Sequence, residues 1–534
     1  MLRYNSRMKK LNNNTLPDDV EALKAMVLEL QNQQLEQQAD AARLQQESER
    51  WKRDFYQLLE KWQLELKKRF AASAEGLPGQ GDLFNEIEDI LQPEADEVAA
   101  EQHIAYTRKV GRRARLDASL PRTEIVHDIS EEEKTCECCG TDMHRMGEDV
   151  SEKLDFIPAK VQVIRHVRPK YSCRTCEQQG TETKIKQAPM PPSMLPKSIA
   201  TPSLLAQIIT AKFQYGLPLY RQEAMFKQFG ADISRQTMSR WLVAVSQKLE
   251  PLYQRMHDIL VQQPVLWADE TTLKVIQSEK SKSYMWVYGC GGDKPPPDST
   301  SPPPNIVLYD YQDGRGGIHP KDFLKGYRGP LQVDGYQGYE QTEAKLAGCW
   351  AHARRKFVDA KTVQGKKKTG KADMAIAFIQ KLYRVEKRMA DKSAEERLSA
   401  RQTESMAILK DFREWLDTQA MHVPPTSIIG KAVQYTLNQW SKLQVYLTDG
   451  RINIDNNRAE RAIKPFVIGR KAWLFANTHG GADASAVLYS LVETAKANDL
   501  QPIDYLMNLF EQWPHVQDEN NVDHLLPWNI KNSV

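Results

Sequence analysis

A seven-residue pattern of apolar and polar positions runs through the N-terminal part of the chain. No proline or glycine interrupts it between Asp18 and Phe70. Its inner positions are mostly apolar or small, and they are Leu23, Val27, Leu30, Gln34, Gln37, Ala41, Leu44, Ser48, Trp51, Phe55, Leu58 and Trp62. The pattern predicts a coiled coil over residues 16–72, in which the polar inner positions would fix the register. A single long helix packed on the protein's own body is the alternative.

Helical periodicity returns between residues 201 and 262. Three helices are predicted there, namely Ser203–Gln214, Leu219–Phe229 and a third that is capped by Ser234 and runs through Trp241 to Leu249. This succession is typical of a helix-turn-helix. Arg235, Gln236 and Arg240, at the start of the last helix, are therefore candidate DNA contacts. An ordinary helical bundle would produce the same pattern.

Four apolar runs of strand type follow in residues 263–350. They are Val265–Thr271, Ser283–Cys290, Asn305–Tyr311 and Gly329–Tyr336. The first and the fourth carry an acidic residue near their C-terminal ends, Asp269 and Asp334. Three antiparallel strands and then a further strand is the order of an RNase H-like sheet, in which the first and fourth strands are neighbours. We therefore expect both carboxylates to meet at one end of the sheet.

The rest of the C-terminal half returns to helical patterns. Residues 351–450 are predicted to form an all-helical insertion, which is basic at its start because residues 351–371 contain eight basic residues and one acid. Residues 451–481 are predicted to return to the core as its second part. Residues 482–534 are predicted to be a C-terminal helical segment.

Two further segments precede these regions. Residues 73–122 are predicted to be a linker, because glycines and a proline are followed by eight acids and no base in residues 82–101. Residues 108–122 then carry six bases against one acid. A basic segment around a glycine can lie in a DNA minor groove, so Arg112 and Arg113 are candidate DNA contacts. A basic tether without such contacts is the alternative.

Two C-x2-C pairs indicate a metal site in residues 123–200. The four cysteines are Cys136, Cys139, Cys173 and Cys176. Each pair can form a tight knuckle, and two knuckles place four thiolates around one structural zinc ion. Alternating valines between the pairs indicate a strand, so the segment is predicted to be a small zinc ribbon. Cys138 is a further thiol, His144 or His166 could replace a cysteine ligand, and a coincidental pairing is the alternative.

Composition and charge narrow the class of protein. The 534 residues are too many for one core, and 41% hydrophobic with 27% charged residues is ordinary for a soluble protein. No apolar stretch resembles a signal peptide or approaches the roughly 20 residues that span a bilayer. Four of seven cysteines form the C-x2-C pairs, which favours reduced thiols. We expect a cytoplasmic protein without membrane contact, whose segregated charges, at a net charge of +3, suit a polyanion partner.

Several motifs are long enough to identify a family. They are SEKLDFIPAKVQVIRHVRPKYSC, PLYRQEAMFKQFGADISRQTMSRW, ADET, VDGY, CWAHARRKF and DNNRAERAIKPF, together with the cysteine pairs. From about Leu16 to Trp513 the sequence closely resembles the large transposase subunit of the insertion-sequence-66 family. The resemblance implies a multidomain α+β protein with a coiled coil, a zinc ribbon, a helical DNA-binding region and an RNase H-like α/β core that contains the helical insertion.

The resemblance also implies a DDE transposase with Asp269, Asp334 and Glu460 as its catalytic and metal-binding triad. The last two lie 126 residues apart, which is more than one crossover needs and requires an insertion between them. Glu270 and Asp455 are alternative acids.

Glu460 is expected on a short helix that begins near Asp455–Asn456. Pro465 should end or kink this helix. We therefore do not expect Lys464 and Lys471 to share its face with Glu460.

Three carboxylates suit two magnesium ions. Phosphodiester transfer develops charge on the attacking and leaving oxygens, and two Mg²⁺ about 3.5–4 Å apart can stabilise both, with Mn²⁺ as a substitute. Without metal the carboxylates repel one another, so Glu460 is expected to stand away from the aspartates. Nearby basic side chains are candidate DNA contacts, with ordinary surface ion pairs as the alternative, and they are His352, Arg354, Arg355, Arg461, Lys464, Arg470 and Lys471.

The predicted function is that of an insertion-sequence transposase, which cleaves element ends to free 3′-hydroxyls and joins them to target DNA. The expected partners are element ends, target DNA, at least one further copy of the chain and the small accessory proteins that usually accompany the family. The expected location is the bacterial cytoplasm, in association with the nucleoid. An RNase H-fold nuclease or resolvase without strand transfer is one alternative. A zinc-containing DNA-binding regulator without catalysis is the other.

Overall fold

A computed structural model of the chain describes residues 19–70, 123–125, 160–172, 185–292, 304–363 and 370–530. The chain divides into two compact units, one made of Met1–Gln92 with His166–Val534 and the other of Pro93–Arg165. The four cysteines predicted to bind zinc, and Arg112 with Arg113, lie outside the described residues. In the part that is described, no helix is both long and apolar enough to cross a membrane.

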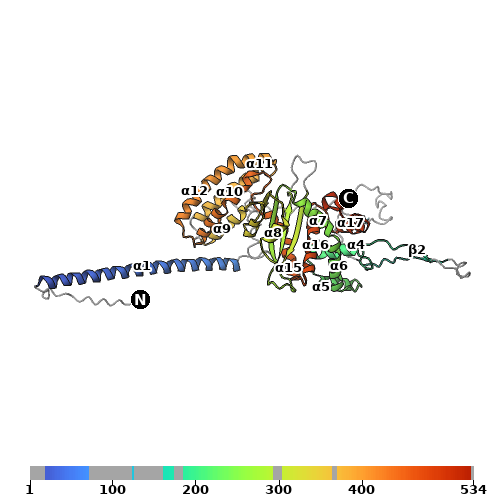
Figure 1. Cartoon of the computed structure of the whole chain (residues 1–534), viewed down its shortest axis with the longest axis horizontal. Coiled ribbons are helices and arrows are strands. Elements are labelled where there is room, and N and C mark those ends of the chain that lie inside the picture. Colours follow the sequence, from blue (N-terminus) through green and yellow to red (C-terminus); the bar gives the residue numbers. More distant parts are fainter. Residues whose placement is uncertain are drawn as a thin grey trace, which may run out of the picture. The chain divides into compact units, whose positions relative to one another are not determined.

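The N-terminal repeat forms one continuous helix of 51 residues, α1 (Val20–Phe70), which is the long blue helix of Figure 1. Several of its apolar side chains are exposed, including Val27, Leu44, Trp51 and Phe55. Exposed apolar side chains in a row along a helix are typical of a surface that is covered by a partner. After this helix, the described residues form a small antiparallel ribbon, in which β1 (Lys170–Tyr171) pairs with β2 (Lys186–Gln187).

A mixed five-stranded sheet forms the core of the larger unit. Its strands are β3 (Leu266–Leu273), β4 (Ser283–Cys290), β5 (Ile306–Gln312), β6 (Pro330–Gln332) and β7 (Lys345–Ala347), in the order β5-β4-β3-β6-β7. The first three are antiparallel neighbours, whereas β6 runs parallel to β3 and β7 parallel to β6. The first and fourth strands are thus neighbours, as expected. β3, β5 and β6 point the same way. β6 ends at Gln332, level with Trp267, so the C-terminal edge of β6 lies beside the first half of β3.

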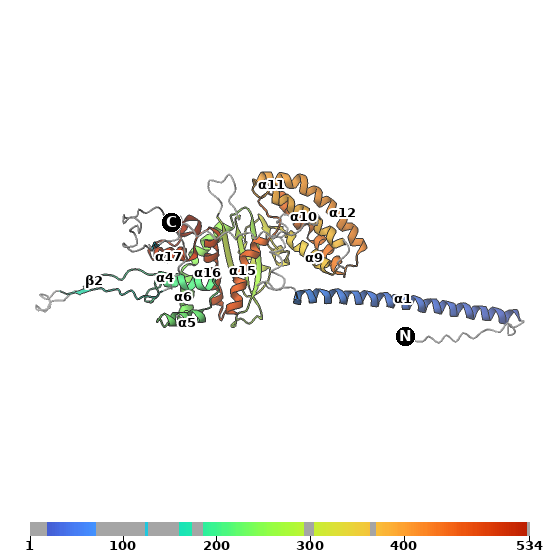
Figure 2. The ribbon, with the colours of Figure 1, turned by 180° about the vertical axis from the view of Figure 1, so that it is seen from behind.

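Helices α15 (Asn457–Trp473) and α16 (His479–Ala497) cover one face of this sheet (Figure 2). Successive side chains of a strand point to opposite faces. Asp269 lies opposite Val287, and Val287 lies opposite Tyr309. The ring of Tyr309 packs against aromatic side chains of both α15 and α16. Asp269 therefore belongs to the face that α15 covers.

Glu270 belongs to the opposite face. It lies opposite Trp286, whose ring contacts the 3-10 helix η2 (Gln337–Gln341). On the same face, the ring of Tyr288 stacks on the short helix α8 (Ile318–Phe323). Two adjacent acids of one strand are thus separated by the sheet itself.

The helices before the sheet pack into the same hydrophobic core as the sheet. They are α4 (Pro202–Phe213), α5 (Leu219–Gln228), α6 (Arg235–Lys248) and α7 (Glu250–Leu260). The predicted cap of the third helix is present, because Oγ of Ser234 accepts a hydrogen bond from the backbone N of Thr237 at 3.2 Å. A short connection joins helices α5 and α6, and this succession is compatible with both a helix-turn-helix and an ordinary helical bundle.

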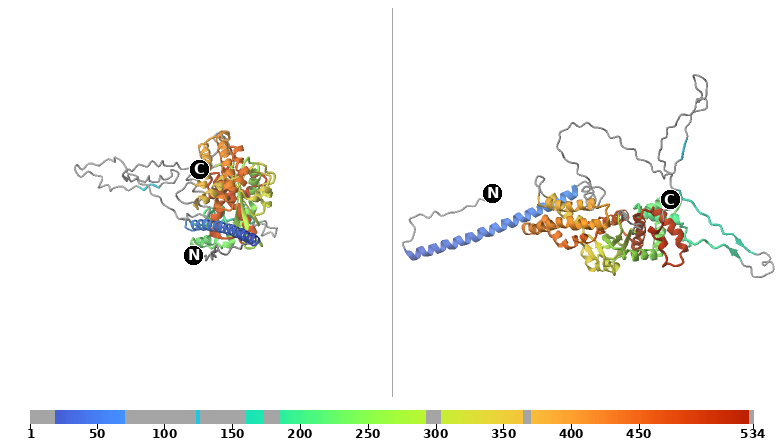
Figure 3. Two further views of the ribbon diagram at one scale, coloured as in Figure 1. Left: turned by 90° about the vertical axis from the view of Figure 1, so that its left-hand side faces the viewer. Right: turned by 90° about the horizontal axis from the view of Figure 1, so that it is seen from above.

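The region between Asp334 and Glu460 has a hydrophobic core of its own. Its helices gather into one bundle, coloured yellow to orange in Figure 3. They are α9 (Trp350–Thr362), α10 (Lys371–Arg388), α11 (Ala394–Ala400), the π-helix η3 (Arg401–Ser405), α12 (Met406–His422), α13 (Ile428–Asn438), α14 (Trp440–Leu443) and the 3-10 helix η4 (Val445–Thr448). This all-helical character agrees with the predicted insertion.

Helix α15 corrects the prediction for the segment around Glu460. It continues through Pro465 to Trp473, so Pro465 does not end it. Ile463, just before the proline, and Phe466 and Val467, just after it, have buried side chains. Their burial, about 1.5–3 kcal/mol each, offsets the roughly 3 kcal/mol that an internal proline costs.

This continuity has a consequence for the charged residues of α15. At 100° per residue, Glu460, Lys464 and Lys471 fall within about 40° of one another, so they share a face, contrary to expectation. After α16 the chain ends in α17 (Pro502–Gln512) and the 3-10 helices η5 (Trp513–His515), η6 (Asp523–Leu525) and η7 (Pro527–Asn529). Hydroxyls of α16 bond directly to the backbone of β5, so this helix is part of the core.

Candidate active site

Two of the three predicted acids lie at the C-terminal edge of β6. Asp269 is in β3, and Asp334 follows the end of β6. The carboxylate of Asp269 accepts a hydrogen bond from the backbone N of Glu270 at 2.8 Å, and that of Asp334 accepts one from the backbone N of Tyr336 at 2.9 Å. Gly335 has a φ of +100°, a conformation that glycine adopts without strain, and this lets the chain turn directly after Asp334.

Glu460 lies in the first turn of α15, and only 5% of its surface is exposed. The start of this helix is tied to both strands that carry the aspartates. Nδ2 of Asn456 donates to the carbonyl of Ala268 in β3 at 2.9 Å. Nε2 of Gln332 in β6 donates to the carbonyl of Asp455 at 3.0 Å. Glu460 is thereby positioned on the face and near the edge where the aspartates lie.

Burial and like charge both disfavour the ionised acids. Burial raises the pKa of Asp269 well above its usual value, and neighbouring acids, Glu460 among them, raise it further. Burial raises the pKa of Glu460 to about 7. Both carboxylate oxygens of Glu460 are buried without a hydrogen-bond partner. Nδ1 of His352 lies 3.7 Å from one of them, but burial lowers the pKa of His352 to about 4, so the ring is neutral at pH 7.

The donor set of the three acids fits a divalent cation that prefers oxygen. The unpartnered oxygens of Glu460 and the repulsion among the acids are both relieved by positive charge. Among the described residues, no group of three or more histidine, cysteine or acidic side chains lies close enough together to hold a metal ion.

The two alternative acids are held by other partners. One carboxylate oxygen of Glu270 accepts a bond from Nε of Arg315 at 2.9 Å, and the other accepts one from the hydroxyl of Tyr339 at 2.8 Å. Asp455 accepts a bond from the hydroxyl of Tyr383 in α10 at 2.9 Å. The side chain of Glu270 thus makes its contacts on the opposite face of the sheet. Asp455 connects the insertion to the start of α15.

The candidate DNA contacts differ in how far their side chains are exposed. Arg235, Gln236 and Arg240 are exposed on α6, and Arg461, Lys464 and Lys471 are exposed on α15. His352 and Arg355 of α9 are partly buried beside Glu460.

Two further candidates are buried or bonded within the fold. Arg354 is only 9% exposed. Arg470 donates to the hydroxyls of Thr271 and Thr272 in β3, at 3.2 and 3.0 Å, and so braces α15 against the sheet.

Sequence reasoning missed the side chains that position the acids. Gln332, Asn456, Arg315 and Tyr339 come from four separate segments and form no motif. The one signal was that Gln332 interrupts an otherwise apolar strand.

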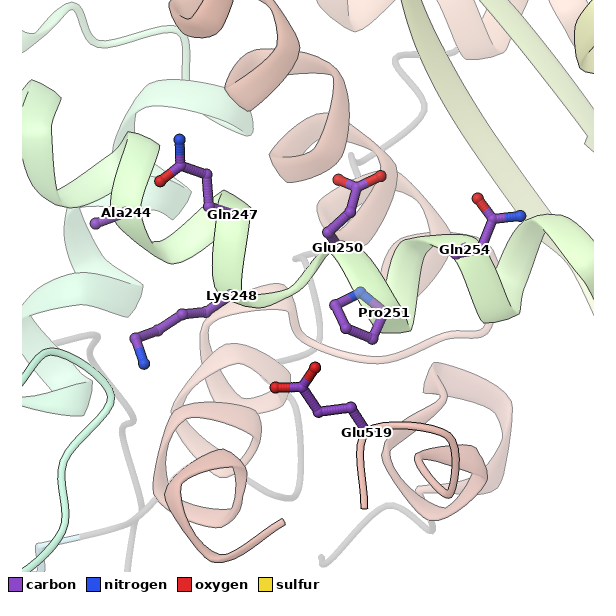
Figure 4. Close-up of a pocket in the computed structure, with 7 residues that line it drawn as sticks. All are labelled: Ala244, Gln247, Lys248, Glu250, Pro251, Gln254 and Glu519. Carbon is purple, nitrogen blue, oxygen red and sulfur yellow. The ribbon is translucent and has the colours of Figure 1, made fainter. Parts of the chain in front are cut away.

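A cavity of about 610 Å³ lies elsewhere, at the junction of α6 and α7 (Figure 4). Its lining combines Lys248 and Glu250 with Glu519 from the C-terminal segment. It contains none of the predicted site residues.

The buried charge of Glu460 gives a prediction about stability. Because the folded pKa of about 7 lies above the ordinary value of 4.5, the folded chain binds this proton more tightly than the unfolded chain. Stability is therefore lost as pH rises from about 4.5 to 7. We expect Glu460→Gln to stabilise protein free of magnesium by about 1–3 kcal/mol at pH 8 and by little at pH 5.

The measurement is the melting temperature of the first unfolding transition at both pH values, with zinc retained. Glu343→Gln is the control, because Glu343 is an exposed acid whose ion pair with Arg328 lies on the surface. An equal effect of Glu460→Gln at pH 5 and pH 8 would contradict the expectation.

Four family models match successive parts of the chain. The model described as "Transposase IS66 family" matches residues 197–484, and "zinc-finger binding domain of transposase IS66" matches residues 133–177. "IS66 C-terminal element" matches residues 490–528, and "Transposase C of IS166 homeodomain" matches residues 57–125.

Relatives of similar length come from Sinorhizobium fredii. The uncharacterized protein y4qI is 33% identical over 97% of this chain and 98% of its own length. The uncharacterized protein y4jD is 32% identical over 82% of this chain and 86% of its own length. With a transposase model covering more than half of the sequence and a zinc-finger model covering the cysteine pairs, the chain belongs to the IS66 transposase family.

Proposed function

We propose that the chain is a DDE transposase that cleaves the 3′ ends of its element and joins them to target DNA, with Asp269, Asp334 and Glu460 as the catalytic triad. The observation that carries this is the sharing of one face and one edge. Asp269 and the α15 helix of Glu460 lie on the same face of the sheet, and Asp334 follows the parallel neighbour of β3. The competing acid Glu270 points to the other face.

The strand order supports an RNase H-like core. The first three strands are antiparallel, the fourth runs parallel to the first, and the fifth runs parallel to the fourth. This is the strand order of that fold. An acid on the first strand, an acid after the fourth and an acid on a following helix are then the three positions that we assign to the triad. The helical insertion between the second and third acids leaves this order unchanged.

The same three residues would hold two magnesium ions. Bound there, the ions would supply charge to the attacking and leaving oxygens of the phosphodiester. Gln332 and Asn456 fix the approach of α15, while the paired Glu270 stays out of the metal site. His352 and Arg355 come from the insertion, so the insertion contributes side chains directly to the surroundings of Glu460.

Residues outside the triad would also bind DNA. The exposed residues Arg235, Gln236 and Arg240 at the start of α6 have the placement of a recognition helix. Arg461, Lys464 and Lys471 are exposed on α15, the helix that carries Glu460, and would contact the DNA ends. Structural zinc held by Cys136, Cys139, Cys173 and Cys176 would fix the ribbon that precedes these helices.

The test is a strand-transfer assay with a duplex that carries the terminal sequence of the element, a plasmid target and Mg²⁺. Joined products support the proposal. Cleavage without joining would favour a nuclease or resolvase, and binding without either reaction would favour a regulator.

We further propose that α1 pairs with α1 of a second copy. Leu44 is 58% exposed on the inner stripe of the heptad, whereas Gln45 lies beside the stripe. Leu44→Pro, or Leu44→Glu, should therefore shift a dimer toward monomer, and Gln45→Glu should not. Sedimentation of the full-length variants measures this. A wild-type chain that stays monomeric both free and on DNA would refute the pairing.

A further inference from the structure

The loop that follows β5 lies on the face of the sheet that carries Glu270, beside the turn that follows Asp334. It comprises Asp313–Gly317, with the sequence DGRGG. β5 and β3 point the same way as β6, but both extend beyond the end of β6, which lies level with Trp267. The hydroxyl of Tyr336 donates to the carbonyl of Arg315, so the loop contacts the turn that follows Asp334. Neither the motifs nor the family resemblance had assigned it a role.

Several contacts fix the shape of this loop. One carboxylate oxygen of Asp313 accepts bonds from the hydroxyls of Ser278 and Ser283, at 2.5 and 2.9 Å. Gly317 packs so closely on the next segment that an added Cβ would lie 2.6 Å from the carbonyl oxygen of Gly338. The loop is thus anchored at both ends, and its centre carries Arg315.

Arg315 is held in place and still faces solvent. Its Nε and Nη2 both bond to one oxygen of Glu270, whose side chain is 1% exposed. Its guanidinium lies 3.9 Å from the ring centre of Tyr336, and the hydroxyl of Tyr336 donates to the carbonyl of Arg315. Yet 43% of the arginine side chain remains exposed, and the N–H groups that Glu270 does not use are available to a ligand.

The surroundings of Arg315 suit an anion. Arg315 stacks on the ring of Tyr336, and the backbone N of Tyr336 donates a hydrogen bond to the carboxylate of Asp334. Tyr336 thus connects the guanidinium to one acid of the triad. Lys280 Nζ would lie 3.4 Å from a Cβ on Gly314, which places a second cation against the same loop. An edge that carries several acids repels DNA unless cations are built in beside them.

We propose that this loop, Asp313–Gly317, contacts a phosphate of the DNA backbone next to the triad, with Arg315 as the contact residue. The proposal rests on the proposed function, because it needs DNA at this edge. A guanidinium that is paired on one side and stacked on an aromatic ring loses little freedom on binding, which suits it to a phosphate. Glu270 is then a positioning residue for Arg315, and it acts on DNA through Arg315.

The experiment separates a DNA contact from a purely structural ion pair. Arg315→Gln alone leaves Glu270 as an unpaired buried charge and is expected to lower the melting temperature. The double variant Glu270→Gln with Arg315→Gln removes that charge and should melt near the wild type. Binding of the full-length, zinc-loaded proteins to a fluorescent 30-base-pair duplex is measured between about 50 and 200 mM salt, with Ca²⁺ present.

We expect the double variant to bind about tenfold more weakly, with a log–log salt slope that is smaller by about one. Arg328→Gln is the matched control. Arg328 is an exposed arginine paired with Glu343 through a 2.9 Å bond, and it precedes β6, at the opposite edge of the sheet. Its slope should equal that of the wild type. A double variant that melts and binds like the wild type would overturn the proposal.

A second measurement does not depend on how the variants fold. Duplex DNA should protect Arg315 of the wild-type protein from an arginine-specific reagent and should leave Arg328 reactive. Equal modification of Arg315 with and without DNA would overturn the loop contact. The strand-transfer assay on the wild type is read separately. Joining with an unprotected Arg315 refutes only the loop, whereas protection without cleavage or joining refutes only the transposase reaction.

Discussion

Replacing Asp269, Asp334 or Glu460 by its amide is expected to lower DNA cleavage and joining by at least about a thousandfold. Asparagine and glutamine keep the size of each side chain but remove a charge that a divalent cation needs. The surrounding structure should survive, because burial already favours the neutral forms of Asp269 and Glu460. DNA binding should therefore persist in all three variants.

Two neighbouring acids provide matched controls within the same site. Glu270→Gln retains the hydroxyl of Tyr339 and the guanidinium of Arg315 as partners on the opposite face. Asp455→Asn retains its bond from Tyr383. Both variants should lose much less activity than the triad variants, because neither side chain is placed where it can hold the catalytic metal.

The decisive measurement is the rate of 3′-end joining at equal DNA occupancy. Combining two triad substitutions should cost little more than one, because the site fails once any ligand is lost. Mn²⁺ should support the wild type, and Ca²⁺ should allow binding without turnover. If Glu460→Gln joins ends at near the wild-type rate while Asp455→Asn does not, the triad is wrongly assigned. If all five variants stay active, the core is not a transposase core.

Local periodicity explains which elements were predictable. The run Ser283–Cys290 is a strand with those same limits, because both of its faces are covered and every residue but one is buried. The Ser234 cap could be predicted from the sequence, because a serine directly precedes a helical pattern. The three-residue strand β7 (Lys345–Ala347) was missed, since three residues are too few to show a period.

Partnerships between distant side chains were not predictable. Arg315 lies 45 residues from Glu270, and Tyr383 lies 72 residues from Asp455, and no local pattern connects either pair. Yet these pairs are what distinguish the alternative acids from Asp269 and Glu460. Adjacency in a strand already implies that Asp269 and Glu270 face opposite ways, but only the structure shows that Asp269 lies on the face covered by α15.

The helix of Glu460 shows tertiary packing overriding a local rule. Pro465 breaks an isolated helix, but the apolar side chains around it are buried against the sheet, which keeps α15 continuous. The burial of Arg354 and the bonds of Arg470 to β3 were not predictable for a related reason. A basic residue on a helix suggests a solvated surface, and only its rotation about the helix axis shows that it points inward.

Removing zinc is expected to unfold the segment that contains the cysteine pairs. Residues 133–177, which match the zinc-finger model, include all four of the predicted ligands. A segment of this size has little apolar material for a core of its own, so metal binding must supply much of its folding free energy. Four thiolates around zinc supply roughly 10–16 kcal/mol of apparent binding energy at pH 7. This is more than the stability of a typical small domain.

Cysteine variants test this with a control inside the same motif. Cys136→Ser should lower the bound zinc well below one ion per chain, expose the segment to proteolysis and weaken end-specific DNA binding. Cys138→Ser changes a neighbouring thiol that the C-x2-C spacing does not use, so its zinc content should match that of the wild type. Metal analysis and melting with a chelator measure both effects. Less than about half an equivalent of zinc in metal-replete wild-type protein, with no effect of chelator, would refute the site. A loss of zinc in Cys138→Ser equal to that in Cys136→Ser would instead show that the ligand set is wrongly assigned.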